Sequence, residues 1–228
     1  MSAKDPEAIR RLFNEVSPTY DLLNRVLSLG CDGHWRRAAA REVRAQPGDL
    51  LLDLCGGTGD LAAELVRRYP DCRVLLVDFA EEMLRLARGK DPVPFPVAAD
   101  ALALPLPDQS CAGITVGFGI RNLKDTREGL VESWRVLKPG GRLAILEFMR
   151  PQGFLAPLKR FALWSLVPVA VRFVAAKQAP AYCYLSRSII GYLSVDEMVA
   201  LLREVGFTDI AVRHQPLGFA WVIGGTRP

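Results

Sequence analysis

"LLDLCGGTGDLAAELVRRYP", residues 51–70, is the stretch that decides the fold. An apolar run leads into the glycine-rich turn Gly56 to Gly59, and a segment with apolar residues at helical spacing continues to Arg68. Glycine permits a tight turn and lets a ligand approach the backbone and the N-terminus of the following helix. The stretch therefore predicts a strand, a ligand-binding loop and a helix.

The same alternation of strand and helix patterns continues to about residue 148. Further apolar strands are predicted in CRVLLVD, PFPVAAD, CAGITVGFGI and RLAILEF, with the turn Pro139 to Gly141 ahead of the last. Short apolar strands separated by amphipathic helices predict a parallel sheet covered on both faces. A late helix that ends at Gly206 and two more strands complete a doubly wound, mostly parallel, seven-stranded α/β sheet.

Composition and charge bound the class of protein. The 228 residues, half of them apolar, suffice for one domain with its own core, and a net charge of +4 does not favour nucleic-acid binding. The N-terminus lacks the apolar segment of a secretion signal, and no uninterrupted apolar run approaches the roughly 20 residues of a membrane span. Five cysteines without a C-x-x-C pair predict neither a disulfide framework nor a metal site. These features predict a cytoplasmic protein.

Two segments lie outside the alternation. Residues 1–46 are predicted as a helical lid ahead of the core, 47–149, and residues 193–228 as a C-terminal helix and strands. The helical insertion after the fifth strand, 150–192, is unusual, because no acidic residue occurs between Phe148 and Val195. It contains FALWSLVPVAVRFVAA, which a proline and an arginine interrupt. It is predicted as an apolar flap or interfacial helix, the alternative being a helix packed on the core.

Acidic residues around the glycine loop discriminate between nucleotides. The spacing from Gly57 through Gly59 to Ala62 also satisfies a dinucleotide fingerprint. However, Asp53 precedes the loop and Asp60 follows it, and these carboxylates would repel a pyrophosphate. They favour a nucleoside with a cationic end, which is S-adenosylmethionine.

Two more acids follow the next strands. Asp78 stands where ribose hydroxyls are bound, and Asp100-Ala101 follows the third strand, where an adenine amino group can be recognised. Each acid alone has an alternative role as a helix cap or turn residue. Their shared position at strand C-terminal ends, the edge where ligands bind in open α/β sheets, favours a binding site.

The order of these motifs resembles that of the class I methyltransferases. Three more stretches, 20–28 (YDLLNRVLS), 117–123 (GFGIRNL) and 182–189 (YCYLSRSI), resemble the ubiquinone/menaquinone biosynthesis C-methyltransferases. The resemblance implies a Rossmann-like fold that binds S-adenosylmethionine. The cofactor residues it implies are Asp53, Gly57, Thr58, Gly59, Asp78, Phe79, Asp100, Ala101 and Gly117.

The resemblance also implies a reaction. A methyl group would pass to a ring carbon of a prenylated hydroquinone, converting demethylmenaquinol to menaquinol and leaving S-adenosylhomocysteine. Arg121 would stabilise the developing oxyanion, or else form an ion pair with Asp100 that orients its loop. Asn122 would hold a hydroxyl or a water, and Asp21, Tyr20 or that water would accept the proton.

Partners and alternatives follow from the same residues. The basic, apolar flap predicts peripheral contact with an anionic membrane surface, at the inner face of the cell membrane. A phospholipid N-methyltransferase, a nicotinamide-dependent oxidoreductase and a binding-only relative are the competing hypotheses. Tail length, naphthoquinol against benzoquinol specificity and oligomeric state, a homo-oligomer included, are left open.

Overall fold

The computed structural model describes the chain except residues 1–5, 18–19, 93, 155, 162–178 and 216–219. Most of the predicted flap sequence FALWSLVPVAVRFVAA lies outside the described residues. In chain order the elements are α1 (Pro6–Val16), α2 (Tyr20–Leu27), α3 (Asp32–Glu42), β1 (Leu50–Leu54), α4 (Asp60–Arg68), β2 (Arg73–Asp78), α5 (Glu81–Ala87), β3 (Phe95–Ala98), β4 (Cys111–Gly117), η2 (Ile120–Asn122), α6 (Thr126–Val136), β5 (Leu137–Phe148), α7 (Ala156–Phe161), α9 (Ala179–Ile190), α10 (Val195–Val205), β6 (Thr208–His214) and β7 (Ala220–Thr226).

The sheet confirms the predicted fold class. Seven strands lie in the order β3-β2-β1-β4-β5-β7-β6. The first five are parallel to one another, and β7 runs antiparallel to both of its neighbours. Strands buried on both faces are typically continuous apolar runs, and β1, which is buried from Leu51 to Leu54, has that pattern except at Asp53.

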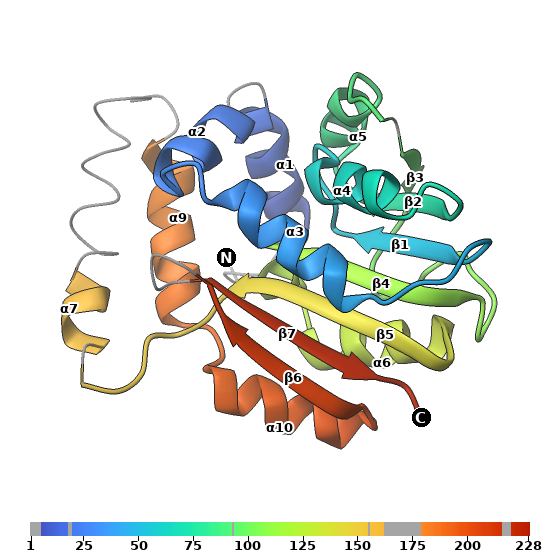
Figure 1. Ribbon diagram of the computed structural model, residues 1–228. Coiled ribbons are helices and arrows are strands. Elements are labelled where there is room, and N and C mark those ends of the chain that lie inside the picture. Colours follow the sequence, from blue (N-terminus) through green and yellow to red (C-terminus); the bar gives the residue numbers. More distant parts are fainter. Residues whose placement is uncertain (1–5, 18–19, 93, 155, 162–178, 216–219) are drawn as a thin grey trace.

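Helices cover both faces of the sheet (Figure 1). On one face, Trp35 of α3, Leu61 of α4 and Leu84 of α5 share an apolar core with the strands. On the other face, Leu130 of α6 and Met198 of α10 pack into a second core. The fold is therefore doubly wound, with its layers positioned by the apolar stripe of each helix.

The boundary between α6 and β5 differs from the sequence prediction. The helix ends at Val136, and the strand already begins at Leu137 and runs through the Pro139 to Gly141 turn. A register shift against β4 accommodates this turn, and Gly140 has a left-handed φ of 78° there. Glycine tolerates that backbone conformation at no steric cost, so the strand bends without ending.

The C-terminal helix ends as its sequence predicts. Ser194 and Glu197 form a reciprocal capping box at the start of α10, and Gly206 closes the helix with a φ of 112°. Both devices satisfy backbone groups that a helix end leaves without partners. Within the part of the chain that the structure describes, no helix combines the length and the hydropathy that crossing a membrane requires.

Candidate active site

A cavity of about 370 Å³ opens at the carboxyl ends of the parallel strands. Open α/β sheets bind ligands at this edge. Eight of the predicted site residues line the cavity: Tyr20, Gly57, Asp78, Phe79, Asp100, Ala101, Gly117 and Asn122. Five predicted residues are not among its lining residues: Asp21, Asp53, Thr58, Gly59 and Arg121.

The glycine loop has the backbone that its sequence predicts. Gly57 and Gly59 have φ values of 56° and 82°, and the space in front of the Gly57 α-carbon is open. At Gly56 a β-carbon would lie only 2.0 Å from Leu76 Cδ1 and 2.7 Å from Asp53 Oδ2. The loop thus packs tightly against Leu76 and Asp53 at Gly56 and leaves open space at Gly57, which suits a ligand held against the backbone.

Asp78 joins the glycine loop to the second strand. Its carboxylate accepts hydrogen bonds from the backbone N–H groups of Gly57 and Ala80, both at 2.8 Å. Burial raises the pKa of Asp78 above the usual range of an aspartate. A carboxylate has about four lone-pair sites, so Asp78 can still accept from ribose hydroxyls in the cavity that it lines.

Asp53 lies behind the loop rather than in the cavity. Its side chain is fully buried and accepts a hydrogen bond from Thr115 Oγ1 at 2.7 Å, while Oδ2 has no partner within the described residues. Burial raises the pKa of Asp53 to about 7. Asp53 therefore does not line the cavity, and it packs against Gly56 behind the loop.

The acidic character of the cavity comes from other residues. Asp60 forms ion pairs with Lys90 and Arg36, which neutralise it. Among the lining residues, Asp78, Asp100 and Glu128 are acidic, and Lys124 is the basic one. The excess of carboxylates favours a cationic ligand, as the sequence predicts, although Asp60 does not supply the charge.

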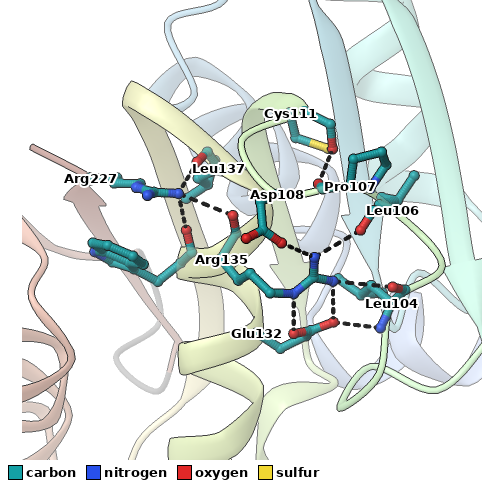
Figure 2. A network of polar contacts seen from close by, with 11 residues as sticks. Leu104, Leu106, Pro107, Asp108, Cys111, Glu132, Arg135, Leu137 and Arg227 are labelled. Atoms are coloured by element: carbon teal, nitrogen blue, oxygen red, sulfur yellow. Dashed lines mark hydrogen bonds and ion pairs between the residues drawn. The ribbon is translucent and has the colours of Figure 1, made fainter.

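The segment between β3 and β4, residues 99–110, is held in place by Arg135 of α6 (Figure 2). The Arg135 guanidinium donates to Glu132 at 2.7 and 2.8 Å and to Asp108 at 2.6 Å. Glu132 in turn accepts from the backbone N–H of Leu104 at 2.6 Å. The bidentate pair with Glu132 fixes the guanidinium on α6. From there Arg135 holds the segment through Asp108 and the carbonyls of Leu104 and Leu106.

This anchored segment supplies one wall of the cavity. Asp100 accepts a hydrogen bond from the backbone N–H of Leu102 at 2.9 Å, which forms a tight turn. Asp100, Ala101 and Leu102 all line the cavity. The predicted adenine side of the site is therefore built on a fixed turn.

Arg121 forms its ion pair with Glu147 and not with the predicted partner Asp100. Its guanidinium contacts Glu147 at the end of β5, and both side chains are almost fully buried. It also donates to the Phe118 carbonyl at 2.9 Å and to Ser188 Oγ at 3.3 Å. The alternative of a loop-orienting ion pair is present, but the prediction that Asp100 is its partner is wrong.

Asn122 does face the cavity, and the sequence did not reveal its partner. Tyr184 of α9 donates a hydrogen bond to Asn122 Oδ1 at 3.2 Å. Two of the stretches used for the family resemblance, 117–123 and 182–189, therefore meet at this contact. Burial raises the pKa of Tyr184, so its hydroxyl stays protonated at neutral pH and acts as a donor.

The two candidate residues on α2 differ in position. Tyr20 lines the cavity, and burial raises its pKa, which favours a hydrogen-bond donor over a proton acceptor. The Asp21 carboxylate instead accepts from Thr58 Oγ1 at 2.6 Å and from Lys90 Nζ at 2.5 Å. Its role as proton acceptor stays a prediction, but both of its oxygens already have protein partners.

An aromatic cluster supports the loop that carries Arg121 and Asn122. Phe118, with a left-handed φ of 58°, stacks on Phe148 at a ring-centroid distance of 4.6 Å. Trp35 contacts both rings edge to face. Such contacts stabilise an otherwise strained backbone conformation and keep Phe118 at the cavity wall.

Four of the five cysteines are among the side chains that the structure describes. Cys31, Cys55, Cys72 and Cys111 are free thiols. Among the residues that the structure describes, no group of three or more His, Cys, Asp or Glu side chains is placed to hold a metal ion. A cationic nucleoside needs no metal bridge, since the acidic cavity compensates its charge directly.

The doubly wound sheet, the glycine loop and the acidic cavity define a class I methyltransferase. The ubiE/COQ5 methyltransferase family model matches residues 1–226. The chain belongs to the ubiE/COQ5 methyltransferase family. It is an S-adenosylmethionine-dependent methyltransferase, and three residues predicted to hold that cofactor, Gly57, Asp78 and Asp100, line the cavity.

Individual relatives agree with the family match. The chain is 40% identical to the ubiquinone/menaquinone biosynthesis C-methyltransferase UbiE of Geobacter sulfurreducens, over 97% of the chain and 89% of the relative. It is 41% identical to the demethylmenaquinone methyltransferase of Deinococcus radiodurans, over 93% of the chain and 89% of the relative. A solved S-adenosylmethionine-dependent methyltransferase from Thermotoga maritima has a TM-score of 0.69 at 21% identity, covering 96% of this chain and 99% of that one, which supports the fold.

Proposed function

We propose that the chain methylates a ring carbon of a prenylated hydroquinone, converting demethylmenaquinol to menaquinol. The names of the relatives support this substrate class. The observation that carries it is the Tyr184–Asn122 hydrogen bond. This bond joins, at the cavity, the stretches 117–123 and 182–189, which resemble the quinone C-methyltransferases. S-adenosylmethionine supplies an electrophilic methyl group, so the protein's task is mainly to position the ring carbon.

Within this proposal, Asn122 binds the reacting hydroxyl. Its Oδ1 accepts from Tyr184, and one amide N–H donates to the Phe118 carbonyl at 3.4 Å, which leaves the other amide N–H to donate to a ring oxygen. A phenol in water titrates near about 10, so a donor that stabilises the phenolate makes the neighbouring carbon more nucleophilic. Arg121 orients this loop through Phe118 and Glu147, and a water held by Asn122 takes the proton in place of Asp21.

The deciding experiment is product analysis with labelled S-adenosylmethionine and a short-tailed demethylmenaquinol. A labelled methyl group on the ring carbon supports the proposal. Label on nitrogen when phosphatidylethanolamine is offered instead, with none on the quinol, would support the phospholipid N-methyltransferase. Absence of turnover with retained S-adenosylhomocysteine binding would support the binding-only relative. The family match decides against a nicotinamide-dependent oxidoreductase.

The proposal includes peripheral contact with an anionic membrane. The acid-free stretch from Phe148 to Val195 supports it, as does the exposure of Phe154 (97%) and Leu158 (64%) near its start. Apolar side chains flanked by basic ones favour the interface of an anionic bilayer. Sedimentation with phosphatidylglycerol vesicles at low salt tests it, and a protein that stays in the supernatant contradicts it.

A further inference from the structure

Lys90 lies in the turn after α5 and joins two carboxylates from separate elements. Its ammonium is 2.5 Å from Asp21 Oδ2 on α2, and it also contacts Asp60 Oδ1 at the start of α4. Thr58 Oγ1 of the glycine loop donates to the other oxygen of Asp21 at 2.6 Å. None of the catalytic roles considered above uses Lys90.

The two acids depend on Lys90 to different degrees. Asp60 has a second cation, Arg36 of α3, at 3.3 Å, and it also lies at a helix N-terminus, where negative charge is favoured. Asp21 has no second cation among the ion pairs of the described residues, so Lys90 alone balances it. Removal of the ammonium therefore affects α2 more than α4.

The position of α2 matters because it closes one wall of the cavity. Tyr20 of α2 and Phe13 of α1 both line the cavity beside Phe79 and Met83. These two aromatic side chains pack against each other and against a small apolar cluster formed by Ala80 and Met83. A helix of eight residues is not stable by itself, so polar contacts contribute substantially to holding α2 in place.

We propose that Lys90 is a positioning residue that holds α2 closed over the bound cofactor by bridging Asp21 to Asp60. Thr58 completes the connection, because it ties the same carboxylate to the loop that supports the cofactor. Lys90 thereby governs how long the cofactor or its product stays bound and leaves the methyl transfer itself unchanged. The inference rests on the cofactor site and is independent of which acceptor is methylated.

The test compares Lys90→Met with Lys90→Arg and with a matched control, Lys138→Met. Lys138 lies in the turn region of β5 and is not among the residues that line the cavity. Dissociation of S-adenosylhomocysteine is measured by stopped flow, and hydrogen exchange of residues 20–27 is measured without ligand. We expect roughly fivefold faster dissociation and faster exchange for Lys90→Met, since partly exposed ion pairs have modest strength. Lys90→Arg should restore most of the wild-type behaviour, and Lys138→Met should match wild type.

Salt separates this role from a merely structural one. Because screening weakens exposed ion pairs, wild-type dissociation should accelerate with ionic strength, and that of Lys90→Met should respond much less. Unchanged dissociation and unchanged exchange in Lys90→Met would overturn the proposal, as would an equal salt response in both proteins. Failure of the quinol assay would leave these readouts intact, so the two proposals fail independently.

Discussion

Arg121 is bound by Glu147, and the pair is buried at the carboxyl end of β5 instead of facing the cavity. A guanidinium neutralised in this way is less available to stabilise a substrate oxyanion. Its contacts with the Phe118 carbonyl and Ser188 instead connect the loop after β4 to α9. In the proposed mechanism Arg121 therefore orients the loop, and Asn122 keeps its predicted role of binding the hydroxyl.

The Arg121–Glu147 pair should show strong energetic coupling. Glu147→Leu leaves a buried, unpaired guanidinium and is expected to lower the free energy of unfolding by about 3–5 kcal/mol. The double variant Arg121→Leu/Glu147→Leu should be markedly more stable than that single variant. Urea unfolding of wild type, both single variants and the double variant measures the coupling. Simple additivity would show that the two residues do not act as a pair.

Asp53 should make stability depend on pH. Its pKa is raised by burial to about 7, so between pH 4 and 7 the folded state holds a proton that the unfolded state has released. Stability contributed by this group therefore decreases as pH rises through that range. Asp53→Asn should remove this contribution, so its advantage over wild type in melting temperature should grow from pH 5 to pH 8. A constant difference would contradict the assignment.

Gly57 and Gly140 offer a matched pair of substitutions. Both have a left-handed φ with open space in front of the α-carbon, so alanine should destabilise each by a similar amount, about 1–2 kcal/mol. Of these two glycines, only Gly57 lines the cavity. Calorimetry should therefore show weaker S-adenosylhomocysteine binding for Gly57→Ala and wild-type binding for Gly140→Ala. Equal affinities in both variants would exclude backbone contact at Gly57.

Arg135→Ala should loosen the wall that carries Asp100. The guanidinium holds Glu132, Asp108 and backbone carbonyls of the segment, and its loss is expected to raise the KM for S-adenosylmethionine roughly tenfold. The control is Arg127→Ala on the same helix, because its ion pair with Glu204 is exposed and of little energetic value. A wild-type KM in Arg135→Ala would show that cofactor binding does not depend on the anchoring of residues 99–110.

Tyr184→Phe tests the acceptor side of the proposed function. It removes the donor to Asn122 and should lower kcat for the quinol about tenfold, with cofactor affinity unchanged, because one lost hydrogen bond near the reacting group costs about 1 kcal/mol or more. Tyr192→Phe is a suitable control, since its hydroxyl contacts Thr126 and not the cavity. An equal kcat in both variants would show that the Tyr184 hydroxyl of α9 does not contribute to turnover of the quinol.

The sequence by itself determined the sheet and the cofactor loop. Strand and helix periodicity between Leu51 and Phe148 is a local property, and the φ demands of Gly57 and Gly59 are local too. Parallel strands bring their carboxyl ends to one edge, and Asp78 and Asp100, which were predicted to share a site, line the same cavity. Glu147 also carries a signal in the sequence, because a charged residue inside an apolar strand requires a buried partner.

Only the tertiary structure decided which charges meet. Glu147 lies 26 residues from Arg121, and Lys90 lies 69 residues from Asp21, so no periodicity or spacing relates the members of either pair. Because η2 packs against β5, Arg121 pairs with Glu147 and not with Asp100. Because α2 lies over the glycine loop, Asp21 contacts Thr58 and Lys90. Local backbone preference therefore determined the framework of "LLDLCGGTGD", 51–60, while burial and charge compensation between distant segments determined what its acidic residues do.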